Sequence, residues 1–476
     1  MKRLWTMLAS ALFAGFAASP AAAVDLLGVY DDALGADPTL REAAANRMAT
    51  LESKPQALAS LLPQITGQYT YSKSWSSGNS TFTQGVDTSN PPDGQLDSII
   101  TGSTGFSQTT DPRKFWQLQL TQTLFRWDQW VTLRQADKQL AQAEATYRAA
   151  EQDLMIRASQ RYFDILGANA TLSAAEAAKE AIGRQLEQAE KRFEVGLIAI
   201  TDVQETQASY DQAVADVISV KRQVATAREF LREITGEYYE QLADAGPDIP
   251  LIPPSPADVE AWVQTALSNN LSLEASRLGA EIALDNVSIR RSGHMPTLDF
   301  FANRSNDDRD ADRQDKPQQA GANILPEGPA DSDIWNDTIG LQLNVPIYSG
   351  GSVKSQSKQA VFEHRASREQ LERVARETER QVRDSYLSVD SEISRVNALA
   401  RSVESNETAL RATEAGFEVG TRTTVDVLDA RRNLFGAQRD YARSRYDYVV
   451  NALLLKQAAG NLSADDLREV DGWLEE

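Results

Sequence analysis

Cysteine is absent from the 476-residue sequence, and histidine occurs only twice, at His294 and His364. Without cysteine the chain can form no disulfide, thiolate metal site, catalytic thiol or lipid-modified N-terminal cysteine. The two histidines lie in different segments with no ligand spacing. We therefore expect no metal site and interpret both as surface or structural residues.

The sequence also lacks an excess of positive charge and the residue sets that catalysis requires. It has 48 lysines and arginines against 68 aspartates and glutamates, a net charge of −20. This balance argues against nucleic acid as the main partner, because phosphate binding requires clustered lysine and arginine. No Ser/His/Asp set or pocket of paired acids can be argued, and Gly350-Gly351 has no P-loop lysine at the required spacing. We expect a protein that is not an enzyme and needs no cofactor.

Long apolar runs are confined to the N-terminus. The basic start Met1–Arg3 precedes an apolar run over Leu4–Ala18, and Ala21–Ala23 offers a cleavage site of small residues. This layout predicts a secretory signal peptide over 1–23. The alternative, an uncleaved membrane anchor, is disfavoured because the run is shorter than the ~20 residues of a membrane span. Nothing after Val24 resembles a membrane-spanning helix, so a membrane crossing by the mature chain would have to use strands.

The chain contains two copies of one plan. Arg192–Gly196 (RFEVG) is repeated as Gly416–Gly420 (GFEVG), an offset of 224 residues. The same offset relates further pairs: Tyr162 and Tyr386, Asp202 and Asp426, Leu231 and Leu455, Gly236 and Gly460. Collinear matches at one offset are not expected by chance, so we interpret them as an internal duplication.

Each half contains two stretches in which apolar and polar residues alternate. The strongest has these apolar members: Trp335, Ile339, Leu341, Leu343, Val345 and Ile347. Alternation places one face of a strand in an apolar medium and the other in a polar one. About ten residues per strand, with tryptophans beside them, is typical of an outer-membrane barrel. A soluble sandwich sheet is the alternative. The polar stretches 76–113 and 306–334 are predicted to be exposed loops.

Helix is predicted for most of the remaining chain. No proline occurs between Arg113 and Gly246 or after Pro346, and these regions are rich in Ala, Gln, Glu, Arg and Leu. A continuous helix over Val131–Phe193 would measure about 95 Å. Such a helix needs coiled-coil-like neighbours. Glycines interrupt each long pattern once, which predicts two antiparallel hairpins with turns at Val195–Thr201 and Val419–Thr424.

These patterns predict the following organisation: signal peptide 1–23, helical segment 24–62, β-hairpin 63–125, long-helix repeat 126–246, linker 247–258, helical segment 259–295, β-hairpin 296–348, long-helix repeat 349–460 and C-terminal tail 461–476. Four strands cannot close a barrel, since bacterial barrels begin at about eight strands. If the strands span a membrane, the chain must oligomerise. The residues alone leave a dimer and a trimer open.

The two turns contain the most specific sequence motifs. Phe193–Gln204 (FEVGLIAITDVQ) and Gly420–Ala430 (GTRTTVDVLDA) closely resemble the periplasmic helix turns of TolC-family outer-membrane exit ducts. The resemblance extends over essentially the whole mature chain. It implies a homotrimer in the outer-membrane lipid, with a twelve-strand barrel continuing into a twelve-helix periplasmic tunnel. It also implies two partners, a periplasmic adaptor protein and an inner-membrane transporter.

The resemblance further implies a gate at the tunnel's periplasmic end. Asp426 and Asp429 match aspartates that narrow the entrance. They lie three apart on a helix and share one face, so a threefold axis would gather their carboxylates and favour cations. The match implies these latch residues: Arg422 bonding Thr201 and Asp202 of a neighbouring protomer, and Gln185 linked to Glu414 within a protomer.

At one latch position the residue differs from that of the family. The best-known members carry tyrosine where this chain has Phe417, and the hydroxyl there bonds the aspartate matched by Asp202. Phenylalanine cannot donate that bond, so we expect one latch fewer.

The sequence therefore predicts an outer-membrane duct of a tripartite export system for proteins, small molecules or both, gated at its periplasmic end. Two alternatives remain. One is a soluble periplasmic coiled-coil scaffold or adaptor. The other is a passive porin, which is disfavoured because porins consist mostly of strands and most of this chain is predicted to be helical.

Overall fold

The computed structural model describes residues 23–83, 102–246, 249–317 and 328–475. Most of the predicted signal peptide, the centres of both predicted loops and two linker residues lie outside this part of the chain. The described residues form two compact units. One comprises the described parts of 1–50, 139–281 and 365–476, and the other those of 51–138 and 282–364. Each unit is described by itself below.

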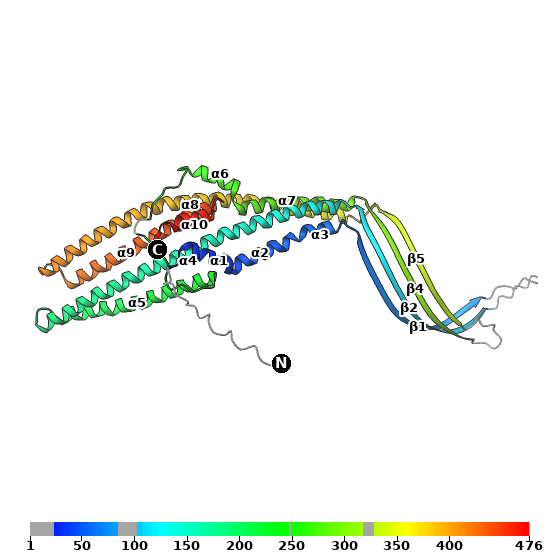
Figure 1. The fold of residues 1–476 in the computed structure, drawn as a ribbon, viewed down its shortest axis with the longest axis horizontal. Coiled ribbons are helices and arrows are strands. Elements are labelled where there is room, and N and C mark those ends of the chain that lie inside the picture. The colour runs from blue at the N-terminus through cyan, green and yellow to red at the C-terminus, as the bar shows by residue number, and fades with distance from the viewer. Residues whose placement is uncertain (1–22, 84–101, 247–248, 318–327, 476) are drawn as a thin grey trace, which may run out of the picture. The chain divides into compact units, whose positions relative to one another are not determined.

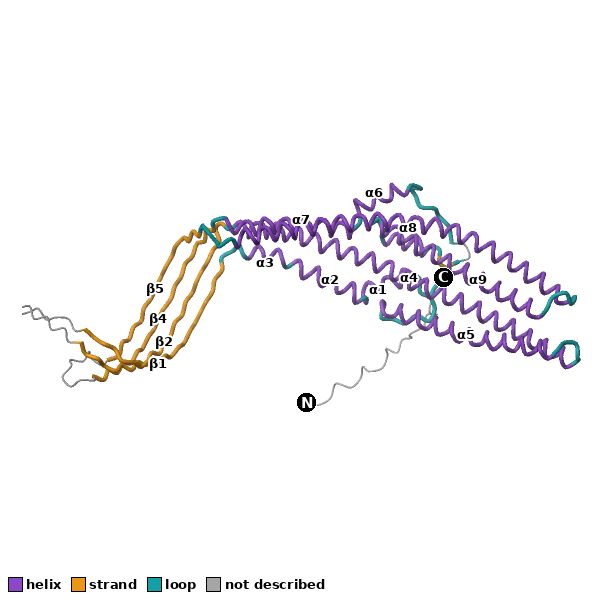
Figure 2. Tube along the Cα trace, turned by 180° about the vertical axis from the view of Figure 1, so that it is seen from behind, coloured by secondary structure: helices purple, strands orange, loops and turns teal. Residues whose placement is uncertain are grey.

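A four-stranded antiparallel sheet is the main feature of the second unit, drawn in orange in Figure 2. Its strands are β1 (Gln64–Thr83), β2 (Gly102–Phe125), β4 (Thr297–Pro317) and β5 (Gly328–Asn344), in the spatial order β1-β2-β4-β5. The pairing of β2 with β4 joins the two halves of the duplication. β1 and β5 are the edges, and neither has a second strand partner among the described residues. The prediction of four strands per chain is confirmed.

The two faces of the sheet differ in chemistry, as the alternation predicts. The register places Ile65, Leu120, Ala302 and Ile339 in one row on the same face. Large apolar side chains on this face are exposed in the single chain: Ile65, Tyr69, Leu118, Ile339, Leu341 and Leu343. The opposite face carries amides and hydroxyls: Gln64, Thr66, Gln68, Gln117, Gln119, Asn303, Ser305 and Thr338. Such a sheet suits lipid on one face and water on the other.

The prediction of irregular loops over 76–113 and 306–334 is wrong for their flanks. β1 and β2 continue into the first segment, and β4 and β5 continue into the second. The reason is that backbone hydrogen bonds pair polar strands as well as apolar ones, whereas alternation fades where both faces meet water. Here the Arg113 guanidinium donates two bonds of 2.6 Å to the Asp307 carboxylate, which holds β2 to β4.

The long helices pair as two antiparallel hairpins (Figure 1), α4 (Trp127–Glu194) with α5 (Ile200–Thr235) and α8 (Ser352–Glu418) with α9 (Thr424–Ala458). The predicted turns are therefore present. The remaining helices are α1 (Leu26–Ala36), α2 (Pro38–Leu51), α3 (Ser53–Ala59), α6 (Val259–Asn269), α7 (Leu271–Arg291) and α10 (Ala464–Asp471). A 3₁₀ turn η1 (Ser292–His294) follows α7, and β3 (Asp244–Ala245) pairs with β6 (Leu474–Glu475).

Buried valines at heptad spacing show why the long helices need neighbours. Val382, Val389 and Val396 of α8 are each at most 4% exposed and lie seven residues apart. Val217 and Val224 of α5 are buried at the same spacing. A seven-residue apolar repeat keeps one seam of a helix facing a partner, as in a coiled coil. Among the described residues, no helix has the length and apolarity needed to cross a membrane.

The main core of the first unit surrounds Tyr162 of α4, which is fully buried. Its hydroxyl donates a 2.6 Å hydrogen bond to the carbonyl oxygen of Ala243, just before β3. Leu26 of α1, Val263 of α6 and Leu467 of α10 are buried in the same cluster. The C-terminal segment is thus packed into the core through α10 rather than trailing from it.

Candidate gate at the helix-hairpin turns

The two hairpin turns are built alike, although they lie 224 residues apart in the sequence. The N–H of the turn glycine donates to the carbonyl three residues earlier, at 2.9 Å for Gly196 and 3.1 Å for Gly420. The next N–H donates to the carbonyl five residues earlier, at 2.9 Å and 2.8 Å. Both glycines have positive φ, 76° and 78°, which glycine adopts without a Cβ penalty. The duplication is therefore also present in the backbone.

The helices that leave the two turns begin differently. In α9 the N–H of Thr423 donates to the Asp426 carboxylate at 2.8 Å, and the Asp426 N–H donates back to the Thr423 hydroxyl at 3.3 Å. This reciprocal pair is a capping box. In α5 the equivalent cap is Ala199, which has no side-chain acceptor. The carboxylate of Asp202 therefore has no capping role, and within the described chain it forms no hydrogen bond or ion pair.

Each predicted constriction aspartate has a local partner. Hydrogen bonds from the backbone and side chain of Thr423, aided by the charge of Arg422, lower the pKa of Asp426. That carboxylate is therefore ionised at neutral pH. Asp429 is exposed and forms a 3.0 Å ion pair with Arg432, three residues further along α9. A single chain thus places both carboxylates at the start of α9, and their gathering around an axis stays a prediction.

The predicted latch residues lie on different hairpins. Arg422 is exposed, and its side chain lies over Gly416, where a Cβ atom would come within 2.8 Å of the arginine Cγ. Arg422 forms no salt bridge with any described residue. Thr201 is exposed and Asp202 half-buried at the start of α5. One chain does not bring Arg422 to either residue, so their bonding between neighbouring chains stays a prediction.

The predicted link between Gln185 and Glu414 is not formed within the described chain. The Glu414 carboxylate instead accepts a 2.6 Å hydrogen bond from Arg431 of α9. Gln185 is 8% exposed, and neither atom of its side-chain amide has a hydrogen-bond partner. A buried amide left unpaired is costly, on the order of 1–3 kcal/mol. This cost favours a state in which Gln185 gains a partner, and the link to Glu414 stays a prediction.

A contact between the two hairpins was missed by sequence reasoning. The Arg192 guanidinium carbon lies 5.1 Å from the ring centroid of Phe417. Arg192 is in the last turn of α4 and Phe417 in the last turn of α8. Nothing in the local sequence signals this pairing, because the two residues are distant in the chain and a cation–π contact has no fixed spacing.

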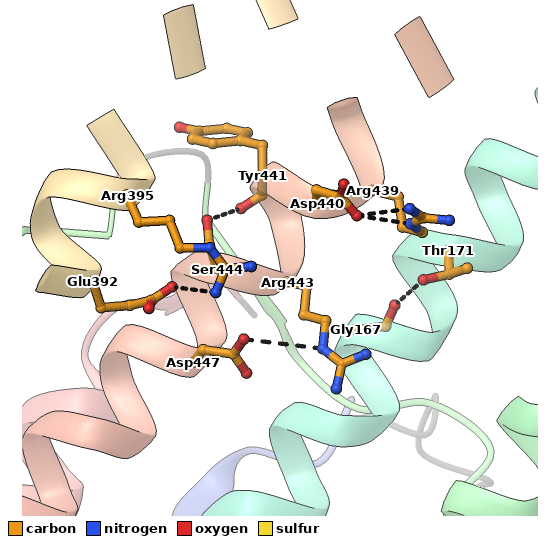
Figure 3. A network of polar contacts seen from close by, with 10 residues as sticks. All are labelled: Gly167, Thr171, Glu392, Arg395, Arg439, Asp440, Tyr441, Arg443, Ser444 and Asp447. Atoms are coloured by element: carbon orange, nitrogen blue, oxygen red, sulfur yellow. Dashed lines mark hydrogen bonds and ion pairs between the residues drawn. The ribbon is translucent and has the colours of Figure 1, made fainter. Parts of the chain in front are cut away.

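A polar cleft of about 690 Å³ is lined by α4, α5, α8 and α9. Figure 3 shows two of its ion pairs, Glu392 with Arg395 at 3.3 Å and Arg443 with Asp447 at 3.9 Å. Each pair lies within one helix, so neither ties one helix to another. Burial raises the pKa of Glu392, an effect that the charge of Arg395 opposes. These ion pairs therefore add no link between the hairpins, whereas two rings that line the cleft do: Phe163 of α4 and Tyr446 of α9 stack at a centroid distance of 5.7 Å.

Comparison with known proteins identifies relatives over the full chain. The family model described as outer membrane efflux protein matches residues 29–237 and 262–461. The outer membrane protein TolC of Escherichia coli K12 is 35% identical over 476 residues, covering 100% of this chain and 90% of that protein. The alkaline protease secretion protein AprF of Pseudomonas aeruginosa is 28% identical over 472 residues, covering 99% and 91%. The crystal structure of the Campylobacter jejuni CmeC outer membrane channel aligns with a TM-score of 0.68 at 16% identity, covering 94% and 90%.

These relatives bear out the predicted fold class, long paired helices with four strands per chain, and the predicted outer-membrane location. Nothing in the comparisons supports the alternative of a soluble scaffold or adaptor. The family is one of channels and transport proteins rather than enzymes. The protein is an outer-membrane export duct, and it belongs to the outer membrane efflux protein family.

Proposed function

We propose that three copies of this chain form the complete duct, with twelve strands closed into a barrel and twelve helices into a tunnel. The observation that carries this proposal is the sheet, which has an exposed apolar face and two edges, β1 and β5, that have no second strand partner among the described residues. Unpaired backbone groups are not tolerated in lipid. Edge β5 of one chain would pair with edge β1 of the next, and three chains exceed the minimum of about eight strands.

The duct would receive its cargo from an inner-membrane transporter through a periplasmic adaptor and perform no chemistry itself. The family description refers to efflux, and the name of the relative AprF refers to protease secretion. These names support passage of small molecules, proteins or both. Energy would come from the inner-membrane partner.

Loss of the Asp429 charge is expected to weaken cation selectivity. In a trimer, Asp426 and Asp429 of each chain would face one axis and attract cations electrostatically. Asp429→Asn should therefore move the cation-to-anion permeability ratio towards one, and Asp426→Asn/Asp429→Asn should move it further. The measurement is the reversal potential across a planar bilayer in a salt gradient. Asp429→Asn is the cleaner variant, because the Asp426 carboxylate also caps α9.

Asp465 offers a matched control for that experiment. It is exposed on α10 and pairs with Arg468 three residues on, as Asp429 pairs with Arg432. Asp465→Asn removes the same charge and the same kind of pair from a helix away from the turns. Its selectivity should equal that of the unmodified protein. Equal permeability ratios in Asp429→Asn and the unmodified protein would reject the constriction assignment.

Removing either latch partner is expected to open the gate. Arg422→Ser and Asp202→Ala should each raise single-channel conductance several-fold, because each removes a charge-assisted bond at all three chain boundaries. Arg422 has no salt bridge within the described chain and Asp202 no partner for its carboxylate, which supports a bond between chains. Bilayer recording of purified protein measures the conductance.

A charge exchange separates a broken bond from a general loosening. Arg422→Asp combined with Asp202→Arg should return conductance towards that of the unmodified protein, whereas each single change should raise it. Arg411→Ser serves as control, since Arg411 is exposed on α8 and bonds only Thr408 of its own helix among the described residues. If Arg422→Ser and Asp202→Ala both had the conductance of the unmodified protein, the latch assignment would be wrong.

A further inference from the structure

The contact between Arg192 and Phe417 joins the two hairpins of one chain close to their turns. The guanidinium carbon is 5.1 Å from the ring centroid, within the ~6 Å at which a cation is attracted to the face of an aromatic ring. Both side chains are half-buried. Partial removal from water strengthens such a contact, because less solvent competes for the cation.

Arg192 has no competing acidic partner in the described chain. Its neighbour Lys191 is paired with Glu187 at 2.5 Å, but Arg192 forms no salt bridge with any described residue. Its cation is therefore directed to the ring of Phe417 rather than to a carboxylate.

The duplication shows that this contact is not a general feature of the turns. The counterpart of Arg192 in the second turn is Gly416, and the counterpart of Phe417 in the first is Phe193. A side chain at 416 would collide with Arg422, since its Cβ would lie 2.8 Å from the arginine Cγ. The glycine at 416 therefore leaves room for the Arg422 side chain, which an arginine at this position would not. Among the described residues, Arg192 lies over an aromatic ring of the other hairpin and Arg422 does not.

We propose that Arg192 is a gate residue, which holds the two hairpins of each chain together through the face of Phe417. The contact supplies the link that a phenylalanine at this position cannot make through a hydroxyl group. The proposal rests on the proposed function, a duct gated at these turns. Arg192 acts within one chain, whereas the Arg422 latch would act between chains.

A double-mutant cycle tests whether the two side chains act together. Arg192→Met keeps the apolar stem and removes the charge, and Phe417→Leu keeps an apolar side chain and removes the ring. Each should raise the open-to-closed ratio in bilayer recordings by about two- to fivefold per contact. The double variant should match the single variants, because either change already breaks the contact. Effects that multiply in the double variant would overturn the proposal.

A distance measurement tests the contact without relying on conductance. The chain has no cysteine, so spin labels can be attached to introduced cysteines alone. Val195 and Val419, which are 69% and 75% exposed in the two turns, are suitable positions for Val195→Cys and Val419→Cys. Labelled chains diluted with unlabelled ones report the distance between hairpins of one chain. Arg192→Met should broaden or lengthen that distance, and Phe193→Leu, the counterpart in the other turn, should not. An unchanged distance in Arg192→Met would overturn the proposal. A longer distance without any channel conductance would instead reject the proposed function and keep the contact.

Discussion

Gly460→Ala is expected to destabilise the fold strongly, lowering the yield of folded protein and its melting temperature. Gly460 follows α9 with φ of +76°, a conformation that costs alanine about 1–2 kcal/mol. A Cβ atom there would lie 2.4 Å from the carbonyl oxygen of Asn269 and 2.8 Å from the nitrogen of Asn270. These are backbone atoms, which cannot turn aside as a side chain can. Overpacking adds about 1–3 kcal/mol, so the total reaches a large part of an ordinary domain's stability.

The segment that Gly460 touches is fixed from both sides. The side-chain amide of Asn270 donates a 3.0 Å bond to the carbonyl of Ala458, and that of Asn269 a 3.1 Å bond to Asn461. The connection between α6 and α7 is therefore fastened to the end of α9. A backbone shift that relieved the clash would break these hydrogen bonds, so the structure cannot accommodate the added Cβ without further loss of stability.

The duplication supplies the control for this experiment. Gly236 is the counterpart of Gly460 and has nearly the same φ, +75°, but its nearest contact for a Cβ is the Ala36 Cβ at an ordinary 3.8 Å. Gly236→Ala should cost only the conformational term. Yield in the membrane fraction and the melting temperature of the helical circular-dichroism signal measure both variants. Equal losses in the two variants would show that conformation, rather than the close approach to Asn269, determines the effect.

This contrast marks the limit of what the sequence could predict. Gly236 and Gly460 were matched from the sequence only as members of the duplication, and the structure places both after a long helix with positive φ. The long helices, hairpin turns and four strands followed from residue patterns because each depends on neighbours in the chain. The lengths of the strands did not, since the polar flanks pair through backbone hydrogen bonds that leave no hydrophobic alternation.

The candidate site divides in the same way. The capping box of α9 could have been recognised from Thr423 and Asp426 at their spacing, and its absence in α5 from Ala199. Because of this local difference the Asp426 carboxylate caps α9, whereas the Asp202 carboxylate caps no helix. The contact between Arg192 and Phe417 could not have been recognised, because it depends on how two distant hairpins meet. Contacts within one turn were open to sequence reasoning, and those between hairpins required the structure.

Tyr162→Ala is the second change expected to have a large effect, because it removes the centre of the main core. Tyr162 is completely buried, and its ring meets that of Phe163 edge-on at a centroid distance of 5.5 Å. Truncating a buried aromatic residue to alanine costs about 3–5 kcal/mol. The cluster around it includes residues of α1, α6 and α10. The loss should therefore loosen both terminal segments together, lowering the melting temperature and exposing the C-terminal segment to protease.

Two further variants separate the ring of Tyr162 from its hydroxyl and its position. Tyr162→Phe keeps the ring but removes the 2.6 Å bond to the Ala243 carbonyl, which should cost about 1–3 kcal/mol. Tyr386 occupies the duplicate position but is only half-buried, so Tyr386→Ala should cost clearly less than Tyr162→Ala. The expected order of melting temperatures places Tyr162→Ala lowest. If Tyr386→Ala were equally low, the core would be shared evenly by the two repeats instead of being centred on the first. The duplicated plan would then be symmetric in energy as well as in sequence, which the unequal burial of the two tyrosines argues against.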